Sequence, residues 1–137
     1  MHYILEACIV GLYTCLIYSL ILPLQVSNKY FVFFIAGFTK HFCSYYLELH
    51  TYYCNNGYAC KNTATNTKKI SNITLGELFI QSILEGFLFI MVGILLFWYV
   101  PVLRNNKLLL FFMIGFLLHI IFEILGLHKI FCKRQCK

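Results

Sequence analysis

Ionisable side chains occur inside the most apolar segments of this sequence, where they are costly to bury. Gly115, His119, Glu123 and Gly126 fall on one helical face, because residues three or four apart are neighbours, and Glu85 lies in another apolar segment. A histidine with two carboxylates could relay protons or bind zinc. The same groups could instead hold helices together by hydrogen bonds, with the glycines permitting close approach. We expect the packing role, since no further ligand follows at zinc-site spacing, and we predict no catalytic residue, metal or cofactor.

The segment around His119 has an earlier copy in the chain. Residues 37–54 align with residues 115–132 without a gap at an offset of 78. The matched pairs are Gly37/Gly115, Phe38/Phe116, His41/His119, Leu49/Leu127, His50/His128, Tyr53/Phe131 and Cys54/Cys132. Upstream, residues 4–7 match residues 83–86 and Pro23 matches Pro101. The sequence therefore predicts a tandem repeat, with units at 1–60 and 75–137.

The repeat suggests which polar residues meet. We predict an intramembrane polar cluster that comprises Glu6, His41, Tyr45, Glu85, His119 and Glu123. Within it, Glu85 is expected near His119 or Glu123, and Glu6, its counterpart in the first unit, is expected to face His41 and Tyr45. Tyr45 stands where the second unit has Glu123, so any role of that carboxylate is asymmetric. Gly37, Gly115 and Gly126 are expected to be helix-packing residues.

Composition indicates how these residues are positioned. Hydrophobic residues make up 61% of the chain and charged residues only 12%, which is typical of a membrane protein. Four segments are long enough to cross a bilayer: about 3–24, 30–52, 75–99 and 108–127. A cleaved signal peptide is disfavoured, because no basic region precedes the first segment. We predict one all-α, polytopic membrane domain over 1–137, built from two helical hairpins. Two crossings per unit make the repeats parallel, related by an axis along the membrane normal.

Charge and cysteine placement give conflicting indications. Lys61, Lys68, Lys69, Lys133, Arg134 and Lys137 lie on the side that holds both termini and the predicted loop 54–73, whereas Lys29, Arg104 and Lys107 lie on the other. The positive-inside rule places the first side in the cytoplasm. Cys54, Cys60, Cys132 and Cys136 also lie there and suggest either two small disulfide loops or one cross-repeat pair, although disulfides rarely persist in the cytosol. Cys8, Cys15 and Cys43 are interpreted as apolar packing residues.

The motif Gly-Phe-x-x-His-x-x-Phe-Glu-x-x-Gly with an aromatic-Cys pair at 115–132, and the run Tyr-Tyr-Cys-Asn-Asn-Gly-Tyr-Ala-Cys at 52–60, resemble a group of small membrane proteins of nucleocytoplasmic large DNA viruses. A composition rich in Asn, Lys, Ile, Phe and Tyr suits an AT-rich viral genome. The resemblance implies a location in the membrane beneath an icosahedral capsid. It also implies a viral thiol-oxidising system, which would reconcile stable disulfides with a cytoplasmic location.

These observations lead to one expected function and two alternatives. We expect a non-enzymatic structural protein of the virion inner membrane, or of the infected-cell membrane, with the termini facing the capsid. Its expected partners are the lipid bilayer, capsid or other virion membrane proteins and further copies of itself, but not nucleic acid, because the basic residues are few. One alternative is a proton or ion transporter that uses Glu85, His119 and Glu123. The other is a membrane thiol-disulfide enzyme, which the lack of Cys-x-x-Cys disfavours.

Overall fold

The computed structural model describes residues 2–61 and 72–136, and every regular element within them is a helix. The long helices are α1 (Tyr3–Ile21), α2 (Lys29–Tyr46), α4 (Leu75–Tyr99) and α6 (Lys107–Ile124). The short ones are α3 (Leu49–Asn56), α5 (Pro101–Asn105), α7 (Leu127–Gln135) and the 3₁₀ turns η1 (Leu22–Leu24) and η2 (Tyr58–Cys60). Half of the predicted loop 54–73, with Lys68 and Lys69, lies outside the described residues, as does Lys137.

Local sequence signals explain where three of the long helices begin. The Asn28 side chain accepts hydrogen bonds from the first backbone N–H groups of α2, and Asn106 does the same for α6. Thr74 and Glu77 form a reciprocal capping box at the start of α4. Pro23 and Pro101 follow the ends of α1 and α4, where proline's missing N–H and fixed ring discourage further regular helix.

Three stretches are long and apolar enough to cross a membrane: Tyr3–Leu24, Leu75–Tyr99 and Lys107–Ile124. This agrees with the predicted membrane class. The predicted span at 30–52 is not among them. Its helix, α2, is as long as α6 and carries as many charged or histidine residues, but it has tyrosine, serine and threonine where α6 has leucine and isoleucine, so its hydropathy is lower.

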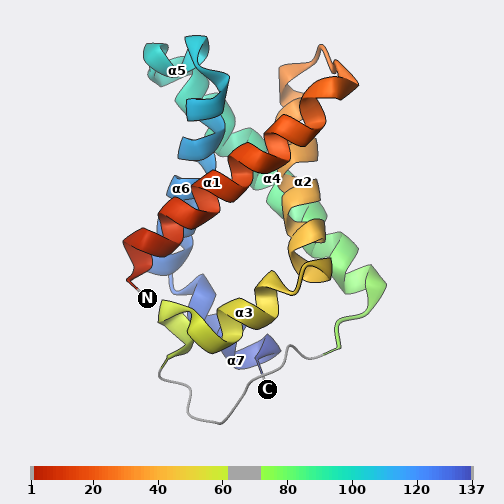
Figure 1. Ribbon diagram of the computed structural model, residues 1–137, viewed down its shortest axis with the longest axis vertical. Coiled ribbons are helices and arrows are strands. Elements are labelled where there is room, and N and C mark those ends of the chain that lie inside the picture. Colours follow the sequence, from red (N-terminus) through yellow and green to blue (C-terminus); the bar gives the residue numbers. More distant parts are fainter. Residues whose placement is uncertain (1, 62–71, 137) are drawn as a thin grey trace.

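The second helix of each half ends earlier than the sequence predicts. The backbone takes a left-handed conformation at Glu48, with φ 56°, and at Gly126, with φ 71°. After these two breaks, α3 and α7 turn aside and lie together beneath the long helices (Figure 1). Residues 54–60, predicted to be exposed loop, therefore form the end of α3 and η2.

The long helices pack mainly between the two sequence halves. α1 lies along α6, and α2 lies along α4, whereas contacts within each hairpin are fewer (Figure 1). The core between them contains Ile17, Phe33, Phe89, Phe111 and Ile114, all almost fully buried. The rings of Tyr18 and Phe111 stack at 4.1 Å between centroids. The halves therefore share one core.

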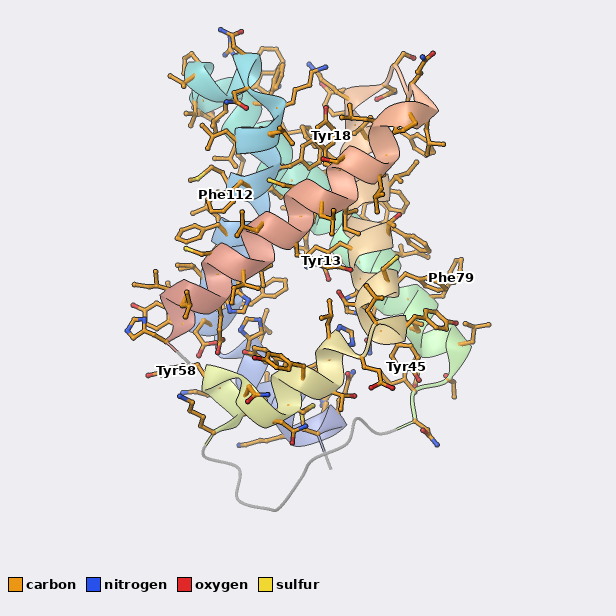
Figure 2. The ribbon with its side chains drawn as sticks, viewed as in Figure 1. Tyr13, Tyr18, Tyr45, Tyr58, Phe79 and Phe112 are labelled. Carbon is orange, nitrogen blue, oxygen red and sulfur yellow. A yellow bond between two sulfur atoms is a disulfide. The ribbon has the colours of Figure 1, made fainter. Side chains whose placement is uncertain are left out.

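The outward faces of the helices are as apolar as the core. On α1 the exposed side chains include Leu5, Leu12, Leu16 and Leu20, each more than half exposed. The α4 helix presents Ile80, Leu84, Phe87, Met91 and Leu95, exposed to a similar degree. Figure 2 shows Phe79 at the outer edge of α4. Because water-exposed surfaces rarely carry such continuous apolar area, these faces are suited to lipid.

Two of the three predicted packing glycines lie at helix contacts. A Cβ added to Gly37 would come 2.8 Å from the Glu85 carbonyl oxygen of α4, and one added to Gly115 would overlap Thr14 of α1. Gly126 does not have this role, because nothing lies within 4 Å of the place where its Cβ would be. Its contribution is the positive φ at the start of α7, a conformation that glycine adopts without strain.

Candidate functional site

The predicted polar residues form two separate clusters. The sequence prediction placed Glu85 near His119 or Glu123 and Glu6 near His41, but the structure has the opposite pairing. Glu85 contacts His41, and Glu6 contacts His119. The reason is the packing of α4 against α2 and of α1 against α6, which brings each carboxylate to the histidine of the other half.

The first cluster, here called the Glu85 cluster, comprises Glu85, Lys40, His41 and Gln81. Lys40 forms an ion pair with one carboxylate oxygen of Glu85, and His41 Nδ1 lies 2.6 Å from the other. His41 Nε2 is 3.3 Å from Gln81 Oε1. The Glu85 carboxylate, 12% exposed, therefore has a cationic partner and a hydrogen-bonding partner at its two oxygens.

The second cluster, here called the Glu6 cluster, comprises Glu6, His119, Glu123 and His128. The Tyr58 backbone N–H donates to Glu6 Oε1 at 2.6 Å, and Glu6 Oε2 lies 3.4 Å from His119 Nε2. The rings of His119 and His128 are 4.4 Å apart, and His128 Nδ1 is 2.8 Å from Glu123 Oε2. Three helices, α1, α6 and α7, thus contribute to one polar site.

Two atoms of the Glu6 cluster lack hydrogen bonds. Glu6 Oε2 and His119 Nε2 are buried and have no partner of hydrogen-bond geometry among residues 2–61 and 72–136, although they face each other. Glu6 is 3% exposed and His119 is 6% exposed, so bulk water does not satisfy either. An unsatisfied buried polar atom is unfavourable and needs an explanation.

Sequence reasoning did not assign His128 to a polar cluster. Its side chain reaches Glu123 because α7 folds back after Gly126, and burial lowers its pKa against the opposing effect of Glu123. The match between His50 and His128 in the two sequence halves was the available signal.

Tyr45 lies outside both clusters, with its ring against Tyr46 and His50. His50 packs between the rings of His41 and Phe131, and its Nδ1 is buried without a hydrogen bond to any residue that the structure describes. Burial, followed by the proximity of His41, lowers the pKa of His50 to about 4. His50 is therefore a neutral part of the layer beneath the membrane helices.

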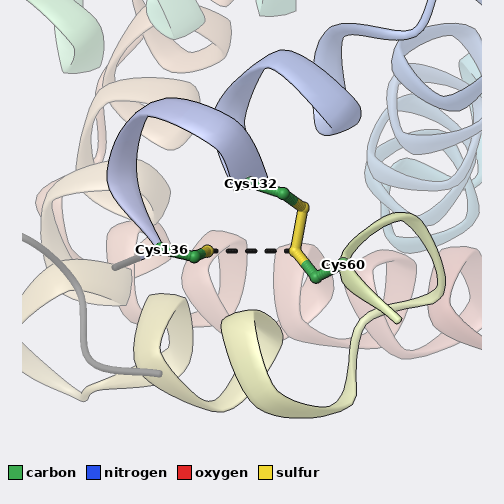
Figure 3. Close-up of side chains that lie close together, drawn as sticks. All are labelled: Cys60, Cys132 and Cys136. Atoms are coloured by element: carbon green, nitrogen blue, oxygen red, sulfur yellow. Dashed lines mark hydrogen bonds between the residues drawn. A yellow bond between two sulfur atoms is a disulfide. The ribbon is translucent and has the colours of Figure 1, made fainter. Parts of the chain in front are cut away.

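Two disulfides join the halves in that layer. They link Cys54 to Cys136 and Cys60 to Cys132. Cys60 Sγ lies 3.8 Å from Cys136 Sγ, so the two bonds are adjacent (Figure 3). Of the two arrangements left open by the sequence, cross-repeat pairing is present, and it occurs twice. The small loops within each unit are absent. Cys8, Cys15 and Cys43 are free and half-buried.

A cavity of about 320 Å³ lies at the opposite end of the helices. Lys29, Lys107, Phe33, Phe97 and Phe111 contribute to its lining. The Lys29 ammonium group sits 4.2 Å from the centroid of the Phe97 ring, a cation–π contact. This end of the molecule therefore combines basic and aromatic side chains, as is usual where a protein meets lipid headgroups.

Comparisons of the chain with protein families, with curated proteins and with solved structures find no match. The Glu85 cluster is a satisfied ion-pair network and the disulfides are buried covalent links. The Glu6 cluster retains unsatisfied ligand atoms.

Proposed function

We propose that this chain is a four-span integral membrane protein with a structural, non-enzymatic role in the membrane of a large DNA virus particle. The observation that carries the proposal is the pair of buried disulfides, which join the halves beneath helices whose outer faces are apolar. Covalent links between the two halves limit their relative movement, which suits a structural role.

A fourth span through α2 is supported by a contact near the start of α1. Near its start, Glu6 accepts a hydrogen bond from the backbone N–H of Tyr58 in η2, and Figure 2 shows Tyr58 beside this end of the helix. Between Ile21, at the far end of α1, and Tyr58 the chain comes back to the start of α1, and α2 and α3 lie on that path. Pairing of Lys40 with Glu85 offsets the cost of a cation within the span.

Two copies of one hairpin are supported by features that occur at matching positions. The carboxylate–histidine pairs Glu85–His41 and Glu6–His119 correspond when the predicted repeat is applied. So do the helix caps Asn28 and Asn106. The disulfides follow the same rule: of the two disulfide-forming cysteines in each unit, the first in one unit is bonded to the second in the other.

A docking role is supported by the polar side of the disulfide layer. Lys61, Lys129, Lys133 and Arg134 are exposed there. Basic side chains next to membrane helices favour anionic headgroups and acidic protein surfaces. We propose that this side faces the capsid and that overlying capsid proteins contact it.

The copy number of the chain in purified, protease-treated virus particles tests this role. Quantitative mass spectrometry against the major capsid protein should find hundreds of copies or more per particle, as a structural membrane component requires. Absence from particles would contradict the proposal and assign the chain to the infected-cell membrane.

Ion transport is the second candidate, because ionisable groups buried among membrane helices commonly line transport pathways. Liposomes that contain the purified chain distinguish the two functions. A structural protein leaves the liposomes ion-tight. Flux that Glu123→Gln combined with His119→Ala abolishes would support transport and contradict a purely structural role.

A further inference from the structure

The Glu6 cluster has a geometry that hydrogen bonding alone does not explain. His119, Glu123 and His128 each offer a ligand atom, and these atoms lie within 4.8 Å of one another. Glu6 Oε2, which is outside this group of three, lies 3.4 Å from His119 Nε2 and is placed to close on an ion as a fourth ligand. In tetrahedral zinc sites, ligand bonds of about 2.1 Å place neighbouring ligand atoms about 3.4 Å apart. The Glu6–His119 separation matches that distance.

The unsatisfied atoms point to a missing partner. Glu6 Oε2 and His119 Nε2 are the two atoms that face each other without a hydrogen bond. The other oxygen of Glu6 is held by the Tyr58 N–H, which orients the carboxylate and leaves Oε2 free. A fixed, buried carboxylate opposite an imidazole nitrogen is the arrangement of a ligand pair.

The charge of the cluster is the strongest argument, because the Glu85 cluster provides an internal comparison. There, one carboxylate is paired with the Lys40 cation. In the second unit Leu118 stands in the position of Lys40, while Glu123 adds a further carboxylate. Within residues 2–61 and 72–136, no lysine or arginine lies within ion-pair distance of Glu6 or Glu123, and Lys61 acts on Glu6 only from farther away. Two carboxylates and no paired side-chain cation are what a divalent metal ion would neutralise.

We propose that Glu6, His119, Glu123 and His128 bind one divalent transition-metal ion of the zinc class. Two imidazoles favour zinc over magnesium or calcium, which prefer oxygen ligands. Four protein ligands leave no open position for substrate, so the ion is structural. It ties α1 to α6 and α7 next to the disulfide layer. This assignment differs from the sequence prediction of no metal, because the position of His128 becomes evident only when α7 is seen to fold back.

Zinc content and affinity test the assignment on the full-length chain in detergent. Wild-type protein should contain about one zinc per chain, and cobalt(II) in its place should give the visible absorption of a tetrahedral site. Glu6→Gln should bind zinc at least about tenfold more weakly in competition with a chelator, since even second-shell changes weaken metal sites by that factor. The matched control is Lys40→Met with Glu85→Gln, which removes the carboxylate and cation of the other cluster and should leave zinc affinity unchanged.

A measurement on the wild-type protein covers the case in which Glu6→Gln does not fold. Chelator should lower the melting temperature of the wild-type chain, and zinc added back should restore it. Two results would overturn the proposal: a wild-type chain that carries no zinc and whose melting does not respond to it, or a folded Glu6→Gln variant with wild-type zinc affinity.

Discussion

The two disulfides should contribute to stability non-additively, and the structure sets the size of the effect. Cys54–Cys136 closes a loop of 82 residues and Cys60–Cys132 a loop of 72. By loop-closure entropy, either bond alone stabilises the fold by about 4.5 kcal/mol. Once one is present, the other closes a ring of only about ten residues, which is worth about 2.7 kcal/mol. These values are upper limits, because helices held in a bilayer leave the unfolded chain fewer conformations.

Replacing Cys54 and Cys136 by serine should therefore cost about 2.7 kcal/mol, and so should replacing Cys60 and Cys132. Replacing all four should cost about 7 kcal/mol, more than the sum of the two. Unfolding by SDS in mixed micelles, followed by circular dichroism, measures each free energy. A loss for the fourfold variant that equals the sum of the two pair losses, or non-reducing peptide maps that link Cys54 to Cys60, would refute the cross-linked arrangement.

Three further perturbations follow from the buried contacts. Lys40→Met should destabilise the chain by about 3–5 kcal/mol because it leaves the Glu85 carboxylate unpaired, and adding Glu85→Gln should recover most of that loss in the same SDS titration. Gly115→Ala should cost about 1–3 kcal/mol through overlap with α1, whereas Gly76→Ala, at a site with open space, should cost nothing by the same assay. Because the pKa of His50 falls from 6.5 to about 4 on folding, the unfolded chain takes up its proton first as the pH drops. Stability should be full above pH 6.5 and fall by up to about 3 kcal/mol towards pH 4. His50→Phe should remove that part of the acid sensitivity, and an unchanged pH profile would refute the assignment.

The sequence was sufficient to predict the membrane class and the apolar helices. Residues 75–99 are α4, and α1 with η1 ends at the predicted Leu24. These helices can be predicted because an apolar segment of about 20 residues has few possible structures other than a membrane-spanning helix. The cysteines that pair were also recognised, although their connectivity was not.

Helix pairing could not be predicted, because membrane helices are apolar on all sides and carry no stripe that identifies a partner. Glu6 was therefore assigned to His41 instead of His119. The break after α2 was missed because its left-handed residue is Glu48, a type that rarely adopts this conformation. The equivalent residue of the second unit, Gly126, was assigned a packing role. A glycine at the end of an apolar segment commonly ends a helix, so this break could have been predicted from the sequence.

The side of the membrane on which each turn lies tests the four-span arrangement most directly. Exposed positions for single introduced cysteines are Ser27, Asn105, Asn72 and Lys129. The free cysteines Cys8, Cys15 and Cys43 can be replaced by alanine so that they do not react with the label. A membrane-impermeant maleimide is applied to sealed vesicles of known orientation. Ser27→Cys and Asn105→Cys should react from one side, and Asn72→Cys and Lys129→Cys from the other. Reaction of Ser27→Cys on the same side as Asn72→Cys would show that α2 does not cross the membrane and would contradict the account.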